Sequence, residues 1–219
     1  MKTDLQLQKD VLDELAFEPS IDHRHIGVAV DCGVVTLSGH ATSFAEKMGA
    51  EHAARRVAGV KALAIELDVK LPSDSRRSDA EIAKSVENTL MWTSSVPINF
   101  INIMVENGWV TLSGDVDWQY QSNAAADAVR PLLGVTGLTN LIQVRALPKV
   151  SADTLKADIE QALKRLAVSE AQQIKVETNG SEVTLSGTVH SWIEADMARQ
   201  TAWRAPGVKH VINHMTLDF

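Results

Sequence analysis

Hydrophobic residues recur at every fourth position in three separate segments of the chain, which is the pattern of a helix with one buried stripe. The stripes are Leu7, Val11 and Leu15; Ile82, Val86 and Leu90; and Leu155, Ile159 and Leu163. Asp4 and Asp79 precede the first two stripes, where a carboxylate can accept hydrogen bonds from free backbone N–H groups. The pattern predicts three amphipathic helices, two of them capped by these aspartates and the third by Ser151 or Asp153.

A β-hairpin is predicted after each helix, because apolar residues alternate with polar ones on both sides of a short turn. The predicted turns are Cys32-Gly33, Asn107-Gly108 and Asn179-Gly180. They pair Val30 with Val35 and Val28 with Leu37, Val105 with Val110 and Ile103 with Leu112, and Val176 with Val183 and Ile174 with Leu185. All three registers place these side chains on one inward face.

The segment Val-Thr-Leu-Ser-Gly occurs three times, and each copy is followed 20 residues after its glycine by a Gly-Val pair. The motif glycines are Gly39, Gly114 and Gly187, and the later pairs begin at Gly59, Gly134 and Gly207. The copies are offset by 75 and then 73 residues. Fixed spacings in three copies indicate a tandem repeat, with the six glycines serving as structural turn or cap residues.

A second helix, rich in alanine, is predicted between the two glycines of each copy, and an alternating strand follows it. Each copy is then helix, strand, strand, helix, strand. The predicted fold class is α+β: three tandem αββαβ modules, each a three-stranded mixed sheet covered on one face by two helices. The modules are expected at residues 1–71, 79–146 and 151–219, separated by Pro- and Ser-containing linkers.

Composition agrees with a folded, soluble protein, since 45% of the 219 residues are hydrophobic and 22% are charged. No apolar run reaches the roughly 18 to 20 residues of a membrane-spanning helix. The first ten residues lack the apolar core of a signal peptide, so we expect a cytoplasmic location. The single cysteine, Cys32, excludes an intramolecular disulfide and is predicted to be a turn residue.

The charge balance argues against nucleic-acid binding. The chain has 21 Lys and Arg against 28 Asp and Glu, a net charge of −7. Phosphate backbones are held mainly by clustered basic residues. No such cluster stands out in any copy, so we expect no nucleic-acid partner.

Catalytic motifs are absent, and we expect a protein that is not an enzyme and that needs no cofactor. The motif serines lack the first glycine and the strand-to-helix turn of a nucleophile elbow. The turn glycines are not followed by the Lys of a phosphate loop. His210 and His214 lie too far apart along one strand to hold a single metal ion. The histidines are predicted to be surface residues, with no catalytic or metal site.

The three copies resemble the BON domain, the module named after bacterial OsmY and nodulation proteins. The resemblance rests on Val-Thr-Leu-Ser-Gly, an aromatic residue near the second helix start, the Gly-Val pair and a last strand carrying Asn. Ile65 replaces that Asn in the first copy. The resemblance implies a non-catalytic module that is associated with osmotic and envelope stress and is proposed to bind phospholipid surfaces.

Two further features are candidates for function. The predicted hairpin register sends Met104 and Trp109 to the outer face of the middle sheet, where an apolar pair needs a partner. That partner is another copy in the chain, which we favour, or a ligand, membrane or second subunit. Asn140 and Asn213 fall on the apolar face of the last strand, where a buried amide must be hydrogen-bonded. They are predicted to be structural amides or to line a polar pocket.

Three functional hypotheses follow for this chain. The first is a stress-associated protein that binds phospholipid or another envelope-related ligand. Since the net charge is negative, such binding cannot depend on general attraction to anionic lipid. The alternatives are a cytoplasmic scaffold for protein–protein interaction and a sensor of a small ligand or ion. The sequence leaves the ligand and the oligomeric state open.

Overall fold

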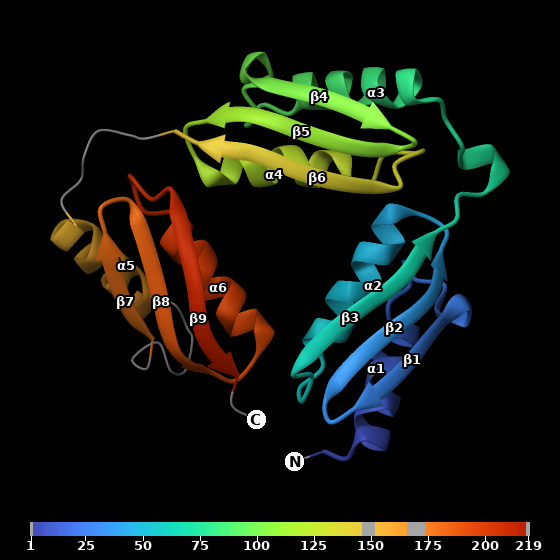
Figure 1. Ribbon diagram of the computed structural model, residues 1–219, viewed down its shortest axis with the longest axis horizontal. Helices are drawn as coiled ribbons and strands as arrows, with labels where there is room; N and C mark the ends of the chain where they lie inside the picture. Colours follow the sequence, from blue (N-terminus) through green and yellow to red (C-terminus); the bar gives the residue numbers. More distant parts are fainter. Residues whose placement is uncertain (1, 146–151, 166–173, 218–219) are drawn as a thin grey trace. The chain divides into compact units, whose positions relative to one another are not determined.

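The computed structural model describes residues 2–145, 152–165 and 174–217 and contains three modules of one topology (Figure 1). The first comprises α1 (Asp4–Phe17), β1 (Ile26–Asp31), β2 (Val34–Ala41), α2 (Phe44–Arg56) and β3 (Ala62–Val69). The second comprises α3 (Asp79–Trp92), β4 (Ile101–Glu106), β5 (Trp109–Val116), α4 (Gln119–Val129) and β6 (Gly137–Val144). The third comprises α5 (Ala152–Arg165), β7 (Lys175–Asn179), β8 (Glu182–Val189), α6 (Trp192–Trp203) and β9 (His210–Leu217).

Short 3-10 helices precede β1 and β4 (η1, His23–His25; η3, Ile98–Phe100), and another lies in the first linker (η2, Ser73–Ser75). The predicted second linker, 146–151, lies outside the described residues.

Each sheet has its strands in sequence order: β1-β2-β3, β4-β5-β6 and β7-β8-β9. In the first and third sheets the first pair is antiparallel and the second pair is parallel. The arrows in Figure 1 run in the same directions in the middle sheet. A strand–helix–strand crossover produces the parallel pair and puts its helix on the same face as the first helix. The predicted fold class is confirmed.

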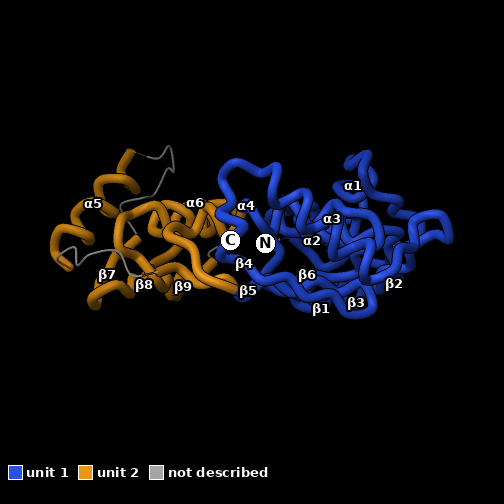
Figure 2. Tube along the Cα trace, turned by 90° about the horizontal axis from the view of Figure 1, so that it is seen from above, with its two compact units in different colours: residues 1–113, 124–141 blue, residues 114–123, 142–219 orange. Residues whose placement is uncertain are grey.

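The chain divides into two compact units, residues 1–113 with 124–141 and residues 114–123 with 142–219 (Figure 2). The division runs through the middle module. The first and third modules each fall within one unit, and each has its own hydrophobic core.

The core of the first module lies between the two helices and the sheet. The stripe of α1 packs with alanines of α2 and with the inward side chains of β2, Val35 and Leu37. Small residues on α2 allow this helix to lie close to the sheet. The apolar stripes of α3 and α5 are buried in the same way, so the three predicted helices are confirmed by their buried faces.

The first hairpin has the predicted register, with Val30 opposite Val35 and Val28 opposite Leu37. Its turn residues, Cys32 and Gly33, have φ of 51° and 83°. Asn107 and Gly108 in the middle module have φ of 52° and 77°. Positive φ at both central positions is the mark of a type I′ turn, whose twist matches that of the flanking strands.

The third hairpin differs from the prediction, because its turn is Gly180-Ser181 and not Asn179-Gly180. Val176 therefore pairs with Leu185, and Thr178 pairs with Val183. Gly180 has a φ of 62°, and Ser181 is not among the described residues with positive φ, as in a type II′ turn. A turn one residue later shifts every pairing by two, and an even shift keeps the same side chains inward.

Asp4 and Asp79 do not cap their helices, contrary to the prediction. Thr3 and Ser78 are the N-caps, and both form capping boxes with the residue three positions later. The Asp4 carboxylate instead accepts hydrogen bonds from the backbone N–H groups of Cys32 and Gly33, at 2.9 and 3.0 Å. Asp79 holds the middle turn in the same way, at 2.9 and 2.8 Å. The third module has Ala152 at this position, and its hairpin turn is of type II′ and not type I′.

The three motif glycines and the three glycines of the Gly-Val pairs all have positive φ, between 89° and 134°. Gly39 lies within β2, where a Cβ atom would overlap the carbonyl oxygen of His25 on the neighbouring chain segment. Gly59 lies in the turn after α2 and not at the helix terminus, since the helix ends at Arg56. Glycine is favoured at these positions because other residues rarely adopt positive φ.

Candidate functional site

Trp109 lies on the outer face of the middle sheet and is 50% exposed, while Met104 is 58% exposed. The indole ring of Trp109 covers Gly137 on β6, so closely that a Cβ atom on Gly137 would overlap the ring. Its Nε1 atom donates a hydrogen bond to the Thr139 hydroxyl at 2.8 Å. Trp109 thus has a partner on its own sheet, which is not among the partners expected from the sequence. The role of Met104 and Trp109 as an interaction surface stays a prediction.

We expect Trp109→Ser to destabilise the middle module by about 1–2 kcal/mol, since half of a large side chain and one hydrogen bond are lost. Met104→Ser is the control and should change stability by less than about 0.5 kcal/mol, because Met104 is more exposed. Thermal melting of the full chain measures both. Equal melting curves for Trp109→Ser and the unaltered protein would contradict the packing role.

Asn140 and Asn213 occupy equivalent positions on the last strands, but both side chains are exposed, so the predicted burial is wrong. The Asn213 Oδ1 atom accepts a hydrogen bond from the backbone N–H of Met215 at 2.9 Å. The last strand forms one edge of its sheet, and the inward neighbours of Asn213, Val211 and Met215, are only half-buried. Asn213 therefore stabilises the backbone of its own strand.

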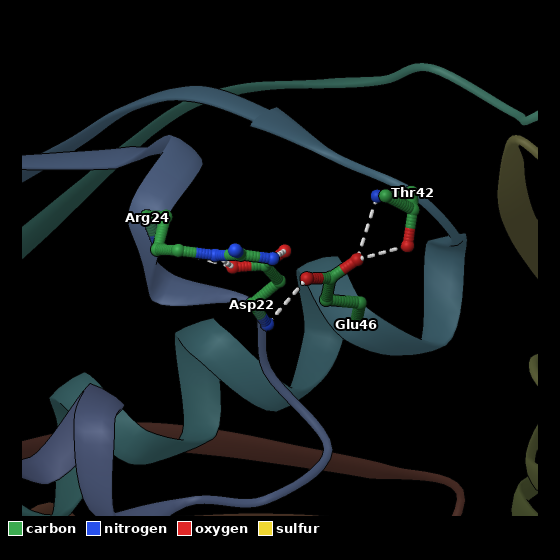
Figure 3. Close-up of polar contacts among 4 residues, drawn as sticks. All are labelled: Asp22, Arg24, Thr42 and Glu46. Atoms are coloured by element: carbon green, nitrogen blue, oxygen red, sulfur yellow. Dashed lines mark hydrogen bonds and ion pairs between the residues drawn. The ribbon is translucent and has the colours of Figure 1, made fainter.

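A buried carboxylate, Glu46, organises the end of the first module where α1 passes into β1 (Figure 3). Its side chain is 6% exposed and lies in the first turn of α2. One oxygen accepts a hydrogen bond from the Asp22 backbone N–H at 2.7 Å. The other accepts from the Thr42 backbone N–H and hydroxyl, both at 2.6 Å. Glu46 therefore ties the α1–β1 connection to the start of α2.

The same position carries a hydrogen-bond acceptor in every module, seven residues after the motif glycine. Gln121 accepts hydrogen bonds from the backbone N–H groups of Asp117 and Trp118, and Glu194 accepts one from His190. This position is not among the residues predicted from the sequence, although its constant offset from the glycine is a visible signal. The recurrence of an acceptor at this position in all three modules, Gln121 included, indicates a structural role for Glu46.

Asp22 is also paired with Arg24 through two side-chain hydrogen bonds, at 2.7 and 2.6 Å (Figure 3). The hydrogen bond from Arg24 holds the pKa of the Asp22 carboxyl well below its ordinary value. Because both partners lie at the surface, this pair contributes little to stability. It does neutralise the guanidinium charge next to His23 and His25.

Cys32 lies in the first turn with Asp4 and Asp31, and ligand atoms of the three approach within 4.8 Å of one another. The neighbouring Asp31 carboxylate raises the pKa of the Cys32 thiol, and Asp4 adds to this effect. A raised pKa keeps the thiolate, the reactive form, scarce. The Asp4 oxygens already accept hydrogen bonds from the backbone N–H groups of the turn, so Asp4 stabilises the hairpin turn.

Three exposed large hydrophobic side chains of the middle module, including its two most exposed, lie where α3 passes into β4. Trp92 is 88% exposed, Met91 60% and Phe100 51%. The buried stripe of α3 stops at Leu90, so the two residues that end the helix project beyond the core. This group is not among the residues predicted from the sequence, because the prediction for that helix covered only its buried stripe.

The chain segment that passes from α3 into β4 carries no charged residue. Residues 88–105 contain no Asp, Glu, Lys, Arg or His across 18 positions. We call this segment the uncharged end. The signal is visible in the sequence, since the equivalent residues 13–30 of the first module contain Asp13, Glu14, Glu18, Asp22, His23, Arg24 and His25. Among the described residues, no helix is long and apolar enough to cross a bilayer.

Three segments of the chain, residues 3–70, 78–146 and 151–218, match the BON domain. The chain belongs to the BON domain family. Its BON modules occur as three tandem copies. The chain is 31% identical over 143 residues to osmotically-inducible protein Y of Escherichia coli K12. The aligned region covers 63% of this chain and 71% of that protein.

Two solved structures of type III secretion proteins are more distant from this BON protein. CdsD of Chlamydia trachomatis is 15% identical, covering 97% of this chain and 92% of the other, with a TM-score of 0.28. The periplasmic domain of PrgH is 13% identical, covering 95% of this chain and 100% of the other, with a TM-score of 0.23.

Proposed function

We propose that this protein is a non-catalytic, osmotic-stress-associated protein that binds phospholipid surfaces through the uncharged end of its middle BON module. The observation that carries the proposal is Trp92, 88% exposed in a segment of 18 residues without a charge. Tryptophan favours the interface between lipid headgroups and acyl chains. The stress association is supported by the similarity to osmotically-inducible protein Y.

The chemistry of the uncharged end suits a lipid interface better than an anionic ligand. Charged side chains are costly to move toward the acyl region, and this segment has none to move. Its exposed polar residues, such as Ser94 and Asn99, are neutral groups that can bind headgroups by hydrogen bonds. A chain with a net charge of −7 gains nothing from a general attraction to anionic lipid.

The expected affinity is modest. Burying a fully exposed large apolar side chain contributes about 1.5–3 kcal/mol. Met91 and Phe100 are already partly buried, so these two and Trp92 together contribute only about 4–6 kcal/mol. This corresponds to an association constant on the order of 10³–10⁴ M⁻¹, close to that of a single myristoyl chain. Binding by one module is therefore reversible and requires lipid at about millimolar concentration.

Flotation of the full chain with vesicles tests the proposal. We expect binding to neutral phosphatidylcholine vesicles to be equal at about 50 mM and about 500 mM salt, because burial of apolar surface is not screened. Anionic phosphatidylglycerol vesicles should bind less at the lower salt, since the net charge of the protein is −7. A chain that stays at the bottom of the gradient with neutral vesicles at about 5 mM lipid contradicts the proposal.

The hypothesis of a protein scaffold and the cytoplasmic location stay predictions. A scaffold would use the outer sheet face around Met104 and Trp109, whereas the lipid proposal depends on Met91, Trp92 and Phe100.

A further inference from the structure

The outer face of the first module carries a row of three metal-ligating side chains, one from each strand of the sheet or its immediate start. His25 precedes β1, and its ring stacks on that of His40 on β2, with centroids 4.7 Å apart and planes at 23°. Asp68 on β3 is in register with His40 in the parallel pair. Residues in register on parallel strands project to the same face of the sheet. His25, His40 and Asp68 thus line up across the sheet.

None of the three side chains is committed elsewhere in the part of the chain that the structure describes. The two rings contact each other, and no hydrogen bond or ion pair to either ring or to the Asp68 carboxylate is formed by the described residues. His25 and Asp68 are exposed and His40 is half-buried, so an ion in solvent can reach them. The Arg24 charge beside His25 is already neutralised by Asp22.

The row is specific to the first module. The equivalent positions are Phe100, Asp115 and Gln143 in the middle module, and the third module has Thr188 and Thr216 in place of His40 and Asp68. The fold therefore does not require imidazoles at these positions. A pair of solvent-accessible histidines that the scaffold does not need is free to serve another purpose.

We propose that His25 and His40 bind a divalent transition-metal ion such as Zn²⁺ or Ni²⁺, with water completing the coordination. The ligand atoms of His25, His40 and Asp68 do not all lie within 4.8 Å of one another, so Asp68 becomes a third ligand only after its side chain rotates toward the ion. Imidazole nitrogen suits these ions, and a carboxylate is an accepted additional ligand. Two nitrogens that share a tetrahedral Zn²⁺ at about 2.0–2.1 Å lie roughly 3.3 Å apart. Rings already in contact reach this spacing by rotation about the terminal torsion, which has a broad energy minimum.

The site lies on the sheet face of the first module, whereas the proposed lipid surface lies on the middle module, so the two proposals are independent. The ligands come from three neighbouring chain segments, and one ion would hold both edges of the sheet to its centre. The expected consequence is a rise in the melting temperature of the first module with added metal, because a ligand that binds only the folded state stabilises it.

Calorimetric titration of the full chain with Zn²⁺ and Ni²⁺ tests the site. We expect one ion per chain, and His25→Phe or His40→Thr should weaken binding about tenfold or more by removing a ligand. These replacements use the residues that the other modules carry at Phe100 and Thr188, so the sheet should stay folded. Asp68→Gln, which introduces the residue type that the middle module carries at Gln143, should have a smaller effect.

The matched control is the double variant His210→Ala/His214→Ala, which removes the other close histidine pair. It should bind Zn²⁺ as the unaltered chain does. Ring-proton NMR signals of His25 and His40 should shift on titration, whereas that of His52 should not. Failure to bind Zn²⁺ at about millimolar concentration, or unchanged binding by the His25→Phe/His40→Thr variant, would overturn the proposal.

Discussion

Replacing Trp92 by serine should reduce binding to neutral vesicles about 20- to 50-fold, the largest functional effect that we expect from a single substitution. The indole contributes about 2 kcal/mol when it leaves water, and a loss of that size corresponds to this factor in the binding constant. The folded state should be almost unaffected, because Trp92 is 88% exposed. Vesicle flotation and thermal melting of the same variant separate the two effects.

Trp109→Ser is the matched control, since it removes the same side chain from another exposed site of the same module. It should lower stability and leave vesicle binding intact, because its ring covers Gly137. The reverse result, in which Trp109→Ser releases the protein from vesicles and Trp92→Ser does not, would move the lipid surface to the outer sheet face.

The first module offers a second comparison through Phe17, the counterpart of Trp92 and also highly exposed. Glu18 follows Phe17 directly and is held as a carboxylate by Arg56, whose hydrogen bond lowers the pKa of Glu18. A charge beside the aromatic ring opposes insertion into lipid. Phe17→Ser should therefore change vesicle binding much less than Trp92→Ser, and Ser94→Glu should weaken binding by placing a charge in the uncharged end.

Replacing Glu46 by alanine should destabilise the first module by about 3 kcal/mol, the largest stability effect that we expect. The substitution leaves three donors, on Asp22 and Thr42, without their acceptor at a partly buried site. It also removes packed atoms beside the core. For a module of this size, the melting temperature should fall by more than about 10 °C. Thermal melting of the full chain measures the fall in melting temperature, as a shift of the transition in which the first module unfolds.

Glu46→Gln is the control, because Gln121 accepts backbone hydrogen bonds at the equivalent position of the middle module. An amide oxygen can replace one carboxylate oxygen, so the loss should stay below about 1.5 kcal/mol. A Glu46→Ala variant that melts like the unaltered chain would show that the α1–β1 connection does not depend on this carboxylate.

Local periodicity was enough to predict the elements and their repetition. Leu7, Val11 and Leu15 share one face of a helix whatever surrounds it, and three copies of one spacing pattern predict three copies of one fold. The first hairpin was also predictable, because two turn residues at a fixed distance from alternating apolar residues determine its register.

The third hairpin was not predictable from its turn residues. Asn179-Gly180 is a strong local signal for a turn, but Asn179 pairs with Glu182 in the strand and the turn lies one residue later. Counted back from the motif glycine, the turn lies at the same distance in all three modules. The spacing within the module therefore predicts the third turn better than the Asn-Gly dipeptide does. Turn preferences differ by small free energies that pairing along an entire strand can exceed.

The candidate sites were also predictable only in part. The uncharged end and the recurring acceptor at Glu46 are visible in the sequence as a missing charge and a constant offset. Only the folded chain shows that Trp109 covers Gly137, that Asp4 binds a turn 28 residues away, and that His25 stacks on His40. The repeated elements follow from the sequence alone, since they depend on neighbours within a few residues. Which distant side chains meet is set by the fold, because those contacts depend on how strands are paired and not on local periodicity.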